Sequence, residues 1–287
     1  VRVVMIGSSP YDETARIEGN TPLRGKNAVM QRVVEFQKAS ADAHGWEFID
    51  YNAPLVEVGR QQQAVDPSFT LTGGDRVHPD NDGHMVMAYL FLKAQGFAGK
   101  EVADIRIDAA KGEVLESANC KISNLRKYGR DLSFDYLANS LPYPMDTVAH
   151  GWGMKRGQAN AAKLVPFVEE MNREMLTVKG LKGNYSVLID GEKIGTWCAG
   201  ELAEGINLAE IVWTPQYQQA LAVMHLNEYR WEIERNFRDY AWMQYDFFQD
   251  HGLLDANDRH AVEVLDREKS KNGWVGIHRE NYSKLMH

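Results

Sequence analysis

An apolar strand, a helix and a second strand follow one another at the start of the chain, and this order restricts the possible folds most. Residues 1–6 are β-branched and almost wholly apolar, as in a buried parallel strand. Apolar residues recur at helical spacing from Lys26 to His44, and Gly45 follows as a C-terminal stop. Residues 46–51 form the next strand. The sequence therefore predicts a right-handed βαβ unit in a parallel sheet, which indicates an α/β fold.

The pattern changes near Gly96. Before it, a helix is predicted between Pro54 and Val65, and another at residues 82–94, which are apolar on nearly all sides. We expect this last helix to be buried against the sheet. After Gly96, short alternating strands begin. We therefore expect one domain at residues 1–96 and an α+β accessory region at residues 97–287.

Turn signals and helical periodicity predict the elements of the accessory region. Two hairpins are expected, one with its turn at Lys111-Gly112 and a clearer one at Asp190-Gly191. Thr214 followed by Pro215 fits an N-cap with proline at the first helical position. The predicted strands are 103–108, 112–117 and the two arms of 184–197, and the predicted helices are 158–174, 215–249 and 255–265.

Charge and cysteine content exclude several classes of protein. The net charge is −8 and no lysine or arginine cluster is dense enough to neutralise phosphates, so we expect no nucleic-acid partner. The longest apolar run, residues 85–92, is shorter than the roughly 20 residues that a membrane helix needs. Cys120 and Cys198 could form one bridge or remain two free thiols, but they are too far apart for a compact metal or redox motif.

Asp75 and His78 are the residues that most directly suggest chemistry. They are three residues apart on a polar loop that leads into the apolar helix. A carboxylate placed this way can hold an imidazole in one tautomer and stabilise its charged form, as in the general-base half of a serine hydrolase. The spacing alone also fits a network that caps the helix, and Asp80 or Asp82 is the expected cap.

A metal site is the rival interpretation, because His78, Asp80, Asp82 and His84 lie within seven residues. An EF-hand loop that begins at His78 would place Tyr89 at position 12, where a bidentate glutamate is required. A zinc site would need three or four converging ligands, and the two histidines have no obvious closing partner. We therefore expect no metal here.

The run DRVHPDNDGHMVMAYLFLKAQG resembles the last conserved block of SGNH/GDSL-type serine hydrolases, in which DxxHP precedes a small-residue turn and a helix. The run IGSSPYDE is similar to the strand and loop after that family's GxND block, and IDGEKIGTW resembles the C-terminal extension of bacterial GDSL-like lipases or acylhydrolases. The resemblance implies that residues 1–96 are the C-terminal half of a flavodoxin-like three-layer α/β/α domain. It also implies hydrolysis of a small-molecule or carbohydrate ester, as an acylhydrolase or deacetylase without a cofactor.

The same resemblance assigns two catalytic roles, with His78 as the general base and Asp75 as the residue that orients it. The family's serine lies in a GDS block, and its oxyanion hole uses the asparagine of GxND. Neither block occurs in this chain, which begins with Val1 and not with methionine. We therefore expect the nucleophilic serine upstream of this chain, and a signal peptide there would give a periplasmic or secreted protein.

Ser8 and Ser9 end the first strand and superficially imitate the GDS block. Only two strands precede His78, however, whereas a doubly wound sheet of this type needs about five. We therefore expect Ser9, Tyr11 and Asp12 to contact substrate at most. Half of such a sheet would leave an open edge and an uncovered apolar face, so residues 1–96 should be unstable by themselves.

Two further interpretations remain open. The chain could be a non-catalytic binding or structural module that keeps the DxxH loop as a relic. A series of aromatic residues could also form a sugar-binding face, although helical aromatic residues more often pack into cores. The series comprises Trp213, Tyr217, Tyr229, Trp231, Phe237, Tyr240, Trp242, Tyr245 and Phe247.

Overall fold

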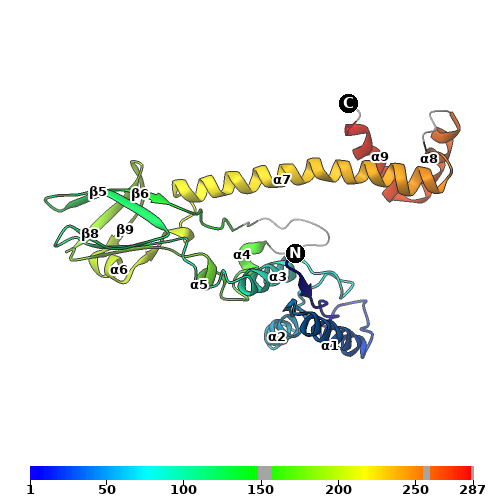
Figure 1. Ribbon diagram of the computed structural model, residues 1–287, viewed down its shortest axis with the longest axis horizontal. Coiled ribbons are helices and arrows are strands. Elements are labelled where there is room, and N and C mark those ends of the chain that lie inside the picture. Colours follow the sequence, from blue (N-terminus) through cyan, green and yellow to red (C-terminus); the bar gives the residue numbers. More distant parts are fainter. Residues whose placement is uncertain (146, 148–156, 255–258, 286–287) are drawn as a thin grey trace. The chain divides into compact units, whose positions relative to one another are not determined.

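The computed structural model describes residues 1–145, 147, 157–254 and 259–285. The chain divides into two compact units, residues 1–218 and 219–287 (Figure 1). The described strands all lie in the first unit and helices occur in both, which confirms the mixed α/β character predicted from the sequence. Among the described helices, none combines the length and the apolar character that crossing a membrane requires.

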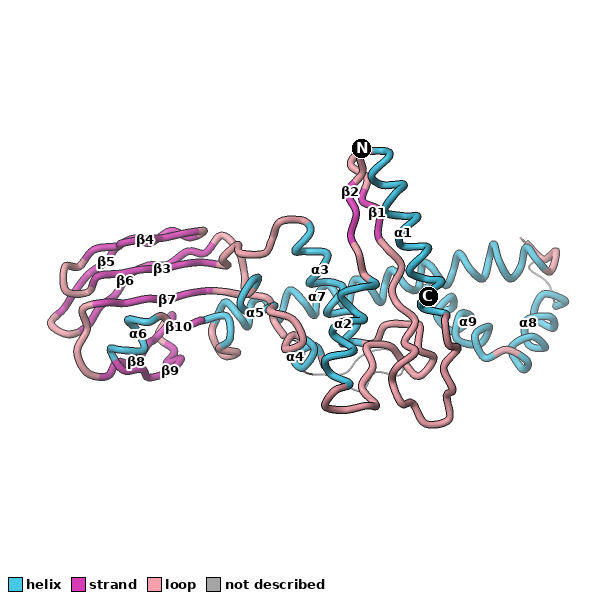
Figure 2. The backbone as a smooth tube through the Cα atoms, turned by 90° about the horizontal axis from the view of Figure 1, so that it is seen from below, coloured by secondary structure: helices cyan, strands magenta, loops and turns pink. Residues whose placement is uncertain are grey.

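The first unit begins with the predicted βαβ arrangement. Strand β1 (Val4–Ile6) and strand β2 (Glu47–Ile49) pair in parallel, with Met5 opposite Phe48. Helix α1 (Lys26–His44) connects them and lies next to both strands, as Figure 2 shows. Gly45 ends α1 in the left-handed region at φ 65°, as expected for a glycine that stops a helix. The bounds of α1 agree with the prediction, whereas each strand is three residues long and so shorter than predicted.

Two more helices complete this part of the unit. Helix α2 (Asn52–Gln63) and helix α3 (Asn81–Ala94) follow β2, close to where the sequence predicts them. Helix α3 is buried as expected, because its first half packs against β2 and α2 and also against the segment around Ala161 and Phe167. The buried side chains of the first cluster are Ile49, Tyr51, Leu55, Phe69, Leu71 and Val86.

The outer side of α1 remains apolar and exposed. Val29, Val33 and Phe36 lie along it, and Phe36 is 72% exposed. In the described part of the chain, β1 and β2 pair with no third strand. Two parallel strands do not make a three-layer α/β/α sandwich, so the flavodoxin-like arrangement implied by the resemblance is not shown by this chain.

After α3, most of the first unit consists of strands. The two compact units divide at residue 218, and the domain boundary expected near residue 96 stays a prediction. The central sheet has the order β10-β7-β3-β4, in which β3 and β7 are parallel and the other pairs are antiparallel. Hairpins β5–β6 and β8–β9 pack on the core of this sheet. The elements are β3 (Ala103–Asp108), β4 (Glu113–Ala118), β5 (Cys120–Tyr128), β6 (Asp131–Ala138), β7 (Glu174–Lys179), β8 (Asn184–Ile189), β9 (Glu192–Cys198), α6 (Ala199–Glu204), β10 (Ile206–Asn207) and the 3₁₀ helix η1 (Leu208–Glu210).

The two hairpins with strong turn signals are confirmed. Asp190 and Gly191 have φ values of 52° and 87°, the combination that a type I′ turn needs. The sequence analysis did not predict hairpin β5–β6, because the register of β5 shifts between Ser123 and Arg126 and this shift breaks the alternation of the strand. Both cysteines are free thiols, and Cys198 is exposed at the N-terminus of α6.

The prediction of one continuous helix at residues 158–174 is wrong. Only two short helices occur there, α4 (Gln158–Ala161) and α5 (Phe167–Met171), and Pro166 separates them. Proline lacks the N–H that a continuous helix would need and its ring clashes with the preceding turn. Glu174 is not helical but begins β7, where it pairs with Ala103.

The second unit is helical. Helix α7 (Pro215–Ala241) begins in the first unit and continues into the π-helix η2 (Trp242–Phe248). Thr214 caps α7 as predicted, because its hydroxyl accepts a hydrogen bond from the N–H of Tyr217 at 3.3 Å. Helices α8 (Arg259–Lys271) and α9 (Gly273–Leu285) follow. Of the helix predicted at 255–265, residues 255–258 lie outside the described residues and the rest falls in α8.

A buried carboxylate and a small apolar cluster hold the second unit together. Asp239 on α7 accepts hydrogen bonds from His278 Nδ1 at 2.6 Å and from Asn281 Nδ2 at 2.5 Å, both on α9. The aromatic series divides, since Phe247 is buried here and Tyr217 in the first unit, whereas Tyr229 and Phe237 are exposed. The buried cluster comprises Met243, Phe247, Leu253, Ala261, Val264, Leu265 and Val275.

Candidate active site

The loop that carries Asp75 and His78 is closed by its own backbone. Thr72 and Pro79 form an isolated antiparallel bridge at its base. Inside it, the N–H of Gly73 donates to the carbonyl of His78 at 2.8 Å, and the N–H of Arg76 donates to the carbonyl of Gly73 at 3.0 Å. The loop is therefore a compact turn directly before α3.

This turn brings Asp75 and His78 into contact, as the spacing predicts. Asp75 Oδ2 is hydrogen-bonded to His78 Nδ1. Asp75 Oδ1 accepts the backbone N–H groups of Val77 and His78 at 3.0 and 3.1 Å, so the carboxylate is held on both oxygens. With Nδ1 facing the carboxylate, Nε2 on the opposite side of the ring is the atom that can exchange a proton with a reacting group.

The electrostatics of Asp75 favour its charged form. Burial raises the pKa of this carboxyl, but the hydrogen bonds from the His78 ring and from the backbone of Val77 and His78 outweigh it and lower the pKa to about 2. Asp75 is therefore ionised at neutral pH and can stabilise an imidazolium at His78. Both side chains remain substantially exposed, with 46% of Asp75 and 65% of His78 accessible.

Arg76 attaches the loop to the segment after β1, a feature that the sequence did not reveal. Its side chain is only 1% exposed, and its backbone has the left-handed φ of 67°. The guanidinium donates to the carbonyls of Asp12 at 3.0 Å, Ala15 at 2.9 Å and Asn20 at 2.5 Å. Because these acceptors are fixed backbone atoms, Arg76 holds Asp75 and His78 in place on either side of it.

The start of α3 supports the loop from the other end. Asp80 caps the helix, with its Oδ1 accepting the N–H groups of Asp82 at 3.0 Å and Gly83 at 3.3 Å, so capping by one of the two aspartates is confirmed. Gly83 packs directly on the bridge at the base of the loop. A methyl group there would collide with the carbonyl of Leu71 and come within 2.8 Å of Pro79 Cβ.

The residues expected to contact substrate lie in the segment that Arg76 binds. Tyr11 is buried, and its hydroxyl accepts the N–H of Leu23 at 3.0 Å. Asp12 accepts the Thr70 hydroxyl at 2.6 Å and the N–H groups of Thr14 and Ala15, both at 2.9 Å.

These contacts stabilise the charge on Asp12. Burial raises the pKa of Asp12, but the hydrogen bonds, led by that from Thr70, keep it below its ordinary value. Ser9, in the segment that follows β1, is partly buried. Contact of Ser9, Tyr11 or Asp12 with a substrate stays a prediction.

In the part of the chain that the structure describes, no group of three or more side chains suited to bind a metal converges around α3. Asp80, one of the four candidate ligands, is used instead as the helix cap.

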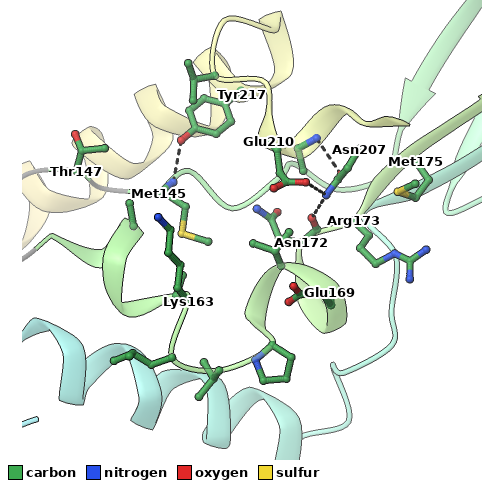
Figure 3. Close-up of a pocket in the computed structure, with 18 residues that line it drawn as sticks. Met145, Thr147, Lys163, Glu169, Asn172, Arg173, Met175, Asn207, Glu210 and Tyr217 are labelled. Carbon is green, nitrogen blue, oxygen red and sulfur yellow. Dashed lines mark hydrogen bonds between the residues drawn. The ribbon is translucent and has the colours of Figure 1, made fainter. Parts of the chain in front are cut away.

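A separate cavity of about 870 Å³ lies in the first unit, and neither Asp75 nor His78 lines it. Its walls come from α4, α5, β7, η1 and the first turn of α7 (Figure 3). The Tyr217 hydroxyl accepts the N–H of Met145 at 2.9 Å at one wall, and Asn207 Nδ2 donates to Glu210 at 3.2 Å at another. The sequence did not reveal this cavity, because its residues are spread over more than 70 positions.

Two comparisons with known proteins gave a match. Residues 221–287 match the family model of the diltiazem deacetylase C-terminal helical domain. The whole chain is similar to the solved structure of BT4096, a gut microbial diltiazem-metabolizing enzyme, with 60% sequence identity and a TM-score of 0.90. This chain shares the fold of that relative. The match covers 100% of this chain but only 65% of the relative, so the chain spans about two thirds of the relative's length. No curated protein matches.

Proposed function

We propose that this chain belongs to an ester hydrolase that removes acetyl groups from small molecules, with His78 as general base and Asp75 as its orienting residue. The observation that carries the proposal is the Asp75–His78 pair on a loop held by the buried Arg76. The relative is a diltiazem-metabolizing enzyme, and the family model that matches residues 221–287 belongs to a diltiazem deacetylase. Both descriptions name the same drug, and that of the family model supports deacetylation as the reaction.

The chemistry follows from the position of His78. Its Nε2 takes the proton of a serine hydroxyl as the serine oxygen attacks the acetyl carbonyl, and the ionised Asp75 stabilises the resulting imidazolium. His78 then gives the proton to the departing alcohol, which leaves an acetylated serine. A water molecule, deprotonated by the same nitrogen, attacks this ester and releases acetate, and the serine recovers its proton.

The nucleophilic serine, in this proposal, lies outside residues 1–287, in a segment that adds strands to the β1–β2 sheet as in SGNH/GDSL-type hydrolases. Two observations support this. One side of α1 is apolar and exposed, and the sheet on which α1 packs has only two strands in the described chain, whereas parallel sheets usually have more strands and are covered on both faces. About a third of the relative's chain also has no counterpart here.

The test is acetate release from diltiazem by the full protein, together with mapping of a fluorophosphonate adduct by mass spectrometry. We expect His78→Ala to reduce kcat by at least about 10³-fold and Asp75→Asn by a similar factor. His225→Ala, which removes an exposed histidine of the second unit, is the matched control and should leave kcat unchanged. The adduct is expected on a serine outside residues 1–287.

Other outcomes would contradict the proposal in different ways. Wild-type turnover by His78→Ala would exclude the assigned base. An adduct on Ser8 or Ser9 would place the nucleophile within this chain. No turnover of diltiazem, of p-nitrophenyl acetate or of an acetylated sugar by the full protein would favour a binding module with a relic DxxH loop. The acetylated sugar also tests the carbohydrate ester that the sequence resemblance implies.

A further inference from the structure

The cavity described above presents charges of both signs to the same space. Figure 3 shows the ammonium of Lys163 on one side, and the carboxylates of Glu169 and Glu210 on the other; all three residues are exposed to solvent. Arg173 also lines the cavity, but its guanidinium pairs with Glu101 at 3.2 Å. Within the described residues, neither Lys163 nor Glu169 forms an ion pair, and Glu210 accepts only the side-chain amide of Asn207. A cation and an anion in direct contact would neutralise one another, but the ammonium of Lys163 and the two carboxylates lie on separate walls of the cavity.

The other residues that line the cavity suit a ligand with an apolar body and polar ends. Tyr217, only 5% exposed, uses its hydroxyl oxygen to accept the Met145 N–H, so its own proton can be donated to a ligand in the cavity. The volume of about 870 Å³ lies in the range of small-molecule sites, roughly 300–1,000 Å³. The apolar lining residues are Leu164, Val165, Pro166, Val168, Met175 and Val212.

Two side-chain amides, those of Asn172 and Asn207, make one wall of the cavity rigid. Asn172 is 1% exposed and bonds both the N–H and the carbonyl of Tyr143, at 2.7 and 3.1 Å. Asn207 accepts the N–H of Glu174 at 2.9 Å and donates to the carbonyl of Asn172 at 3.1 Å. This wall of the cavity is therefore preformed, which reduces the ordering that a ligand must impose on binding.

We propose that this cavity binds a zwitterionic small molecule with an apolar body. Its protonated amine contacts Glu169 and Glu210, and its carboxylate contacts Lys163 and the Tyr217 hydroxyl. Charge-assisted hydrogen bonds of this kind are stronger than neutral ones and fix the orientation of the ligand. The site is independent of the hydrolytic function, because neither Asp75 nor His78 takes part.

The test is calorimetric titration of the full protein with the dipeptide phenylalanyl-leucine and two blocked forms of it. N-acetyl-phenylalanyl-leucine lacks the amine, and phenylalanyl-leucine amide lacks the carboxylate. The dipeptide is expected to bind at one saturable site, and each blocked form at least about tenfold more weakly, since a charged hydrogen bond is lost.

Two variants of the cavity identify the side chains that bind each end of the dipeptide. Glu169→Gln should weaken binding of the dipeptide about tenfold and leave the N-acetyl form unaffected, because that form has no amine to lose. Lys163→Met should weaken the dipeptide similarly and leave the amide form unaffected. Glu192→Gln and Lys121→Met, at exposed positions outside the cavity, are the matched controls and should change nothing.

The proposal is overturned if the dipeptide does not saturate, if all three compounds bind equally, or if the two cavity variants weaken all compounds alike. Acetate release from diltiazem is measured separately on the same variants. It is expected to stay at the wild-type rate, so failure of this site and failure of the proposed hydrolase can be distinguished.

Discussion

Asp75 is the residue whose ionisation can be followed directly. Its pKa is about 2, below the ordinary 3.8, because hydrogen bonds to the carboxylate exist only in the folded loop. A lowered pKa means that the stabilisation is complete above the unfolded value of 3.8 and is lost as the pH falls through about 2. We therefore expect the ¹³C signal of the Asp75 carboxyl to titrate near pH 2, and activity lost between pH 7 and 4 to have another cause. A midpoint near 3.8 would mean that the contact with His78 does not persist in solution.

Arg76 allows a second prediction at the scale of one residue. Arg76→Met removes a buried guanidinium and leaves the carbonyls of Asp12, Ala15 and Asn20 without their donor. We expect a loss of about 3 kcal/mol in the free energy of unfolding, measured with urea, and a fall in kcat for acetate release because the loop loses its anchor. Arg60→Met, which breaks only an exposed pair with Glu57, is the control and should leave the free energy of unfolding close to that of the wild type. Equal effects of the two variants would exclude the anchoring role.

The sequence indicated the pair but not its anchor, and the reason is physical. Asp75 and His78 are three residues apart, so a turn brings them together without help from the rest of the fold. Arg76 instead bonds atoms 56 to 64 residues away, and only the folded chain determines which carbonyls those are.

At the scale of single helices, Gly83 and Gly59 form a matched pair. Both are buried glycines of helices, and alanine in a helix is ordinarily better than glycine by about 1 kcal/mol. In α3 the new methyl would collide with Leu71, so Gly83→Ala should destabilise the protein by about 1–3 kcal/mol and disturb the adjacent loop. In α2 the nearest atom to a new methyl at Gly59 is the Gln63 amide nitrogen at 3.9 Å, so Gly59→Ala should stabilise the protein by up to about 1 kcal/mol. Thermal unfolding of both variants is the measurement, and the same sign for both would contradict the close packing of α3.

The helices and hairpins that were predicted correctly carry their signals locally. Helix α1 has its stop at Gly45, and hairpin β8–β9 has Asp190-Gly191. The errors occur where a local pattern conflicts with tertiary contacts. Residues 158–174 have helical spacing, yet Pro166 breaks the helix and Glu174 joins β3 in the sheet. In hairpin β5–β6, the register shift between Ser123 and Arg126 breaks the alternation of β5, and only the pairing with β6 shows where this shift lies.

For the whole molecule, the sequence indicated a mixed α/β chain and an uncovered apolar face. On the interpretation proposed above, the strands that cover α1 and complete the β1–β2 sheet lie outside these residues. The sequence could therefore not predict the rest of that sheet. The relative's additional third of chain agrees with that interpretation.

The exposed side of α1 provides the test at this scale, through Phe36. In residues 1–287 this side chain is 72% exposed, so Phe36→Asp should change the stability of that chain by less than about 0.5 kcal/mol. If further strands cover α1 in the full protein, the same substitution buries a charge there and should cost at least about 2 kcal/mol. Val65→Asp, at a position 88% exposed, is the control and should be neutral in both forms. Because only a covered α1 makes the effect of Phe36→Asp depend on the rest of the protein, an equally small effect in both forms would remove the structural support for a sheet completed from outside this chain.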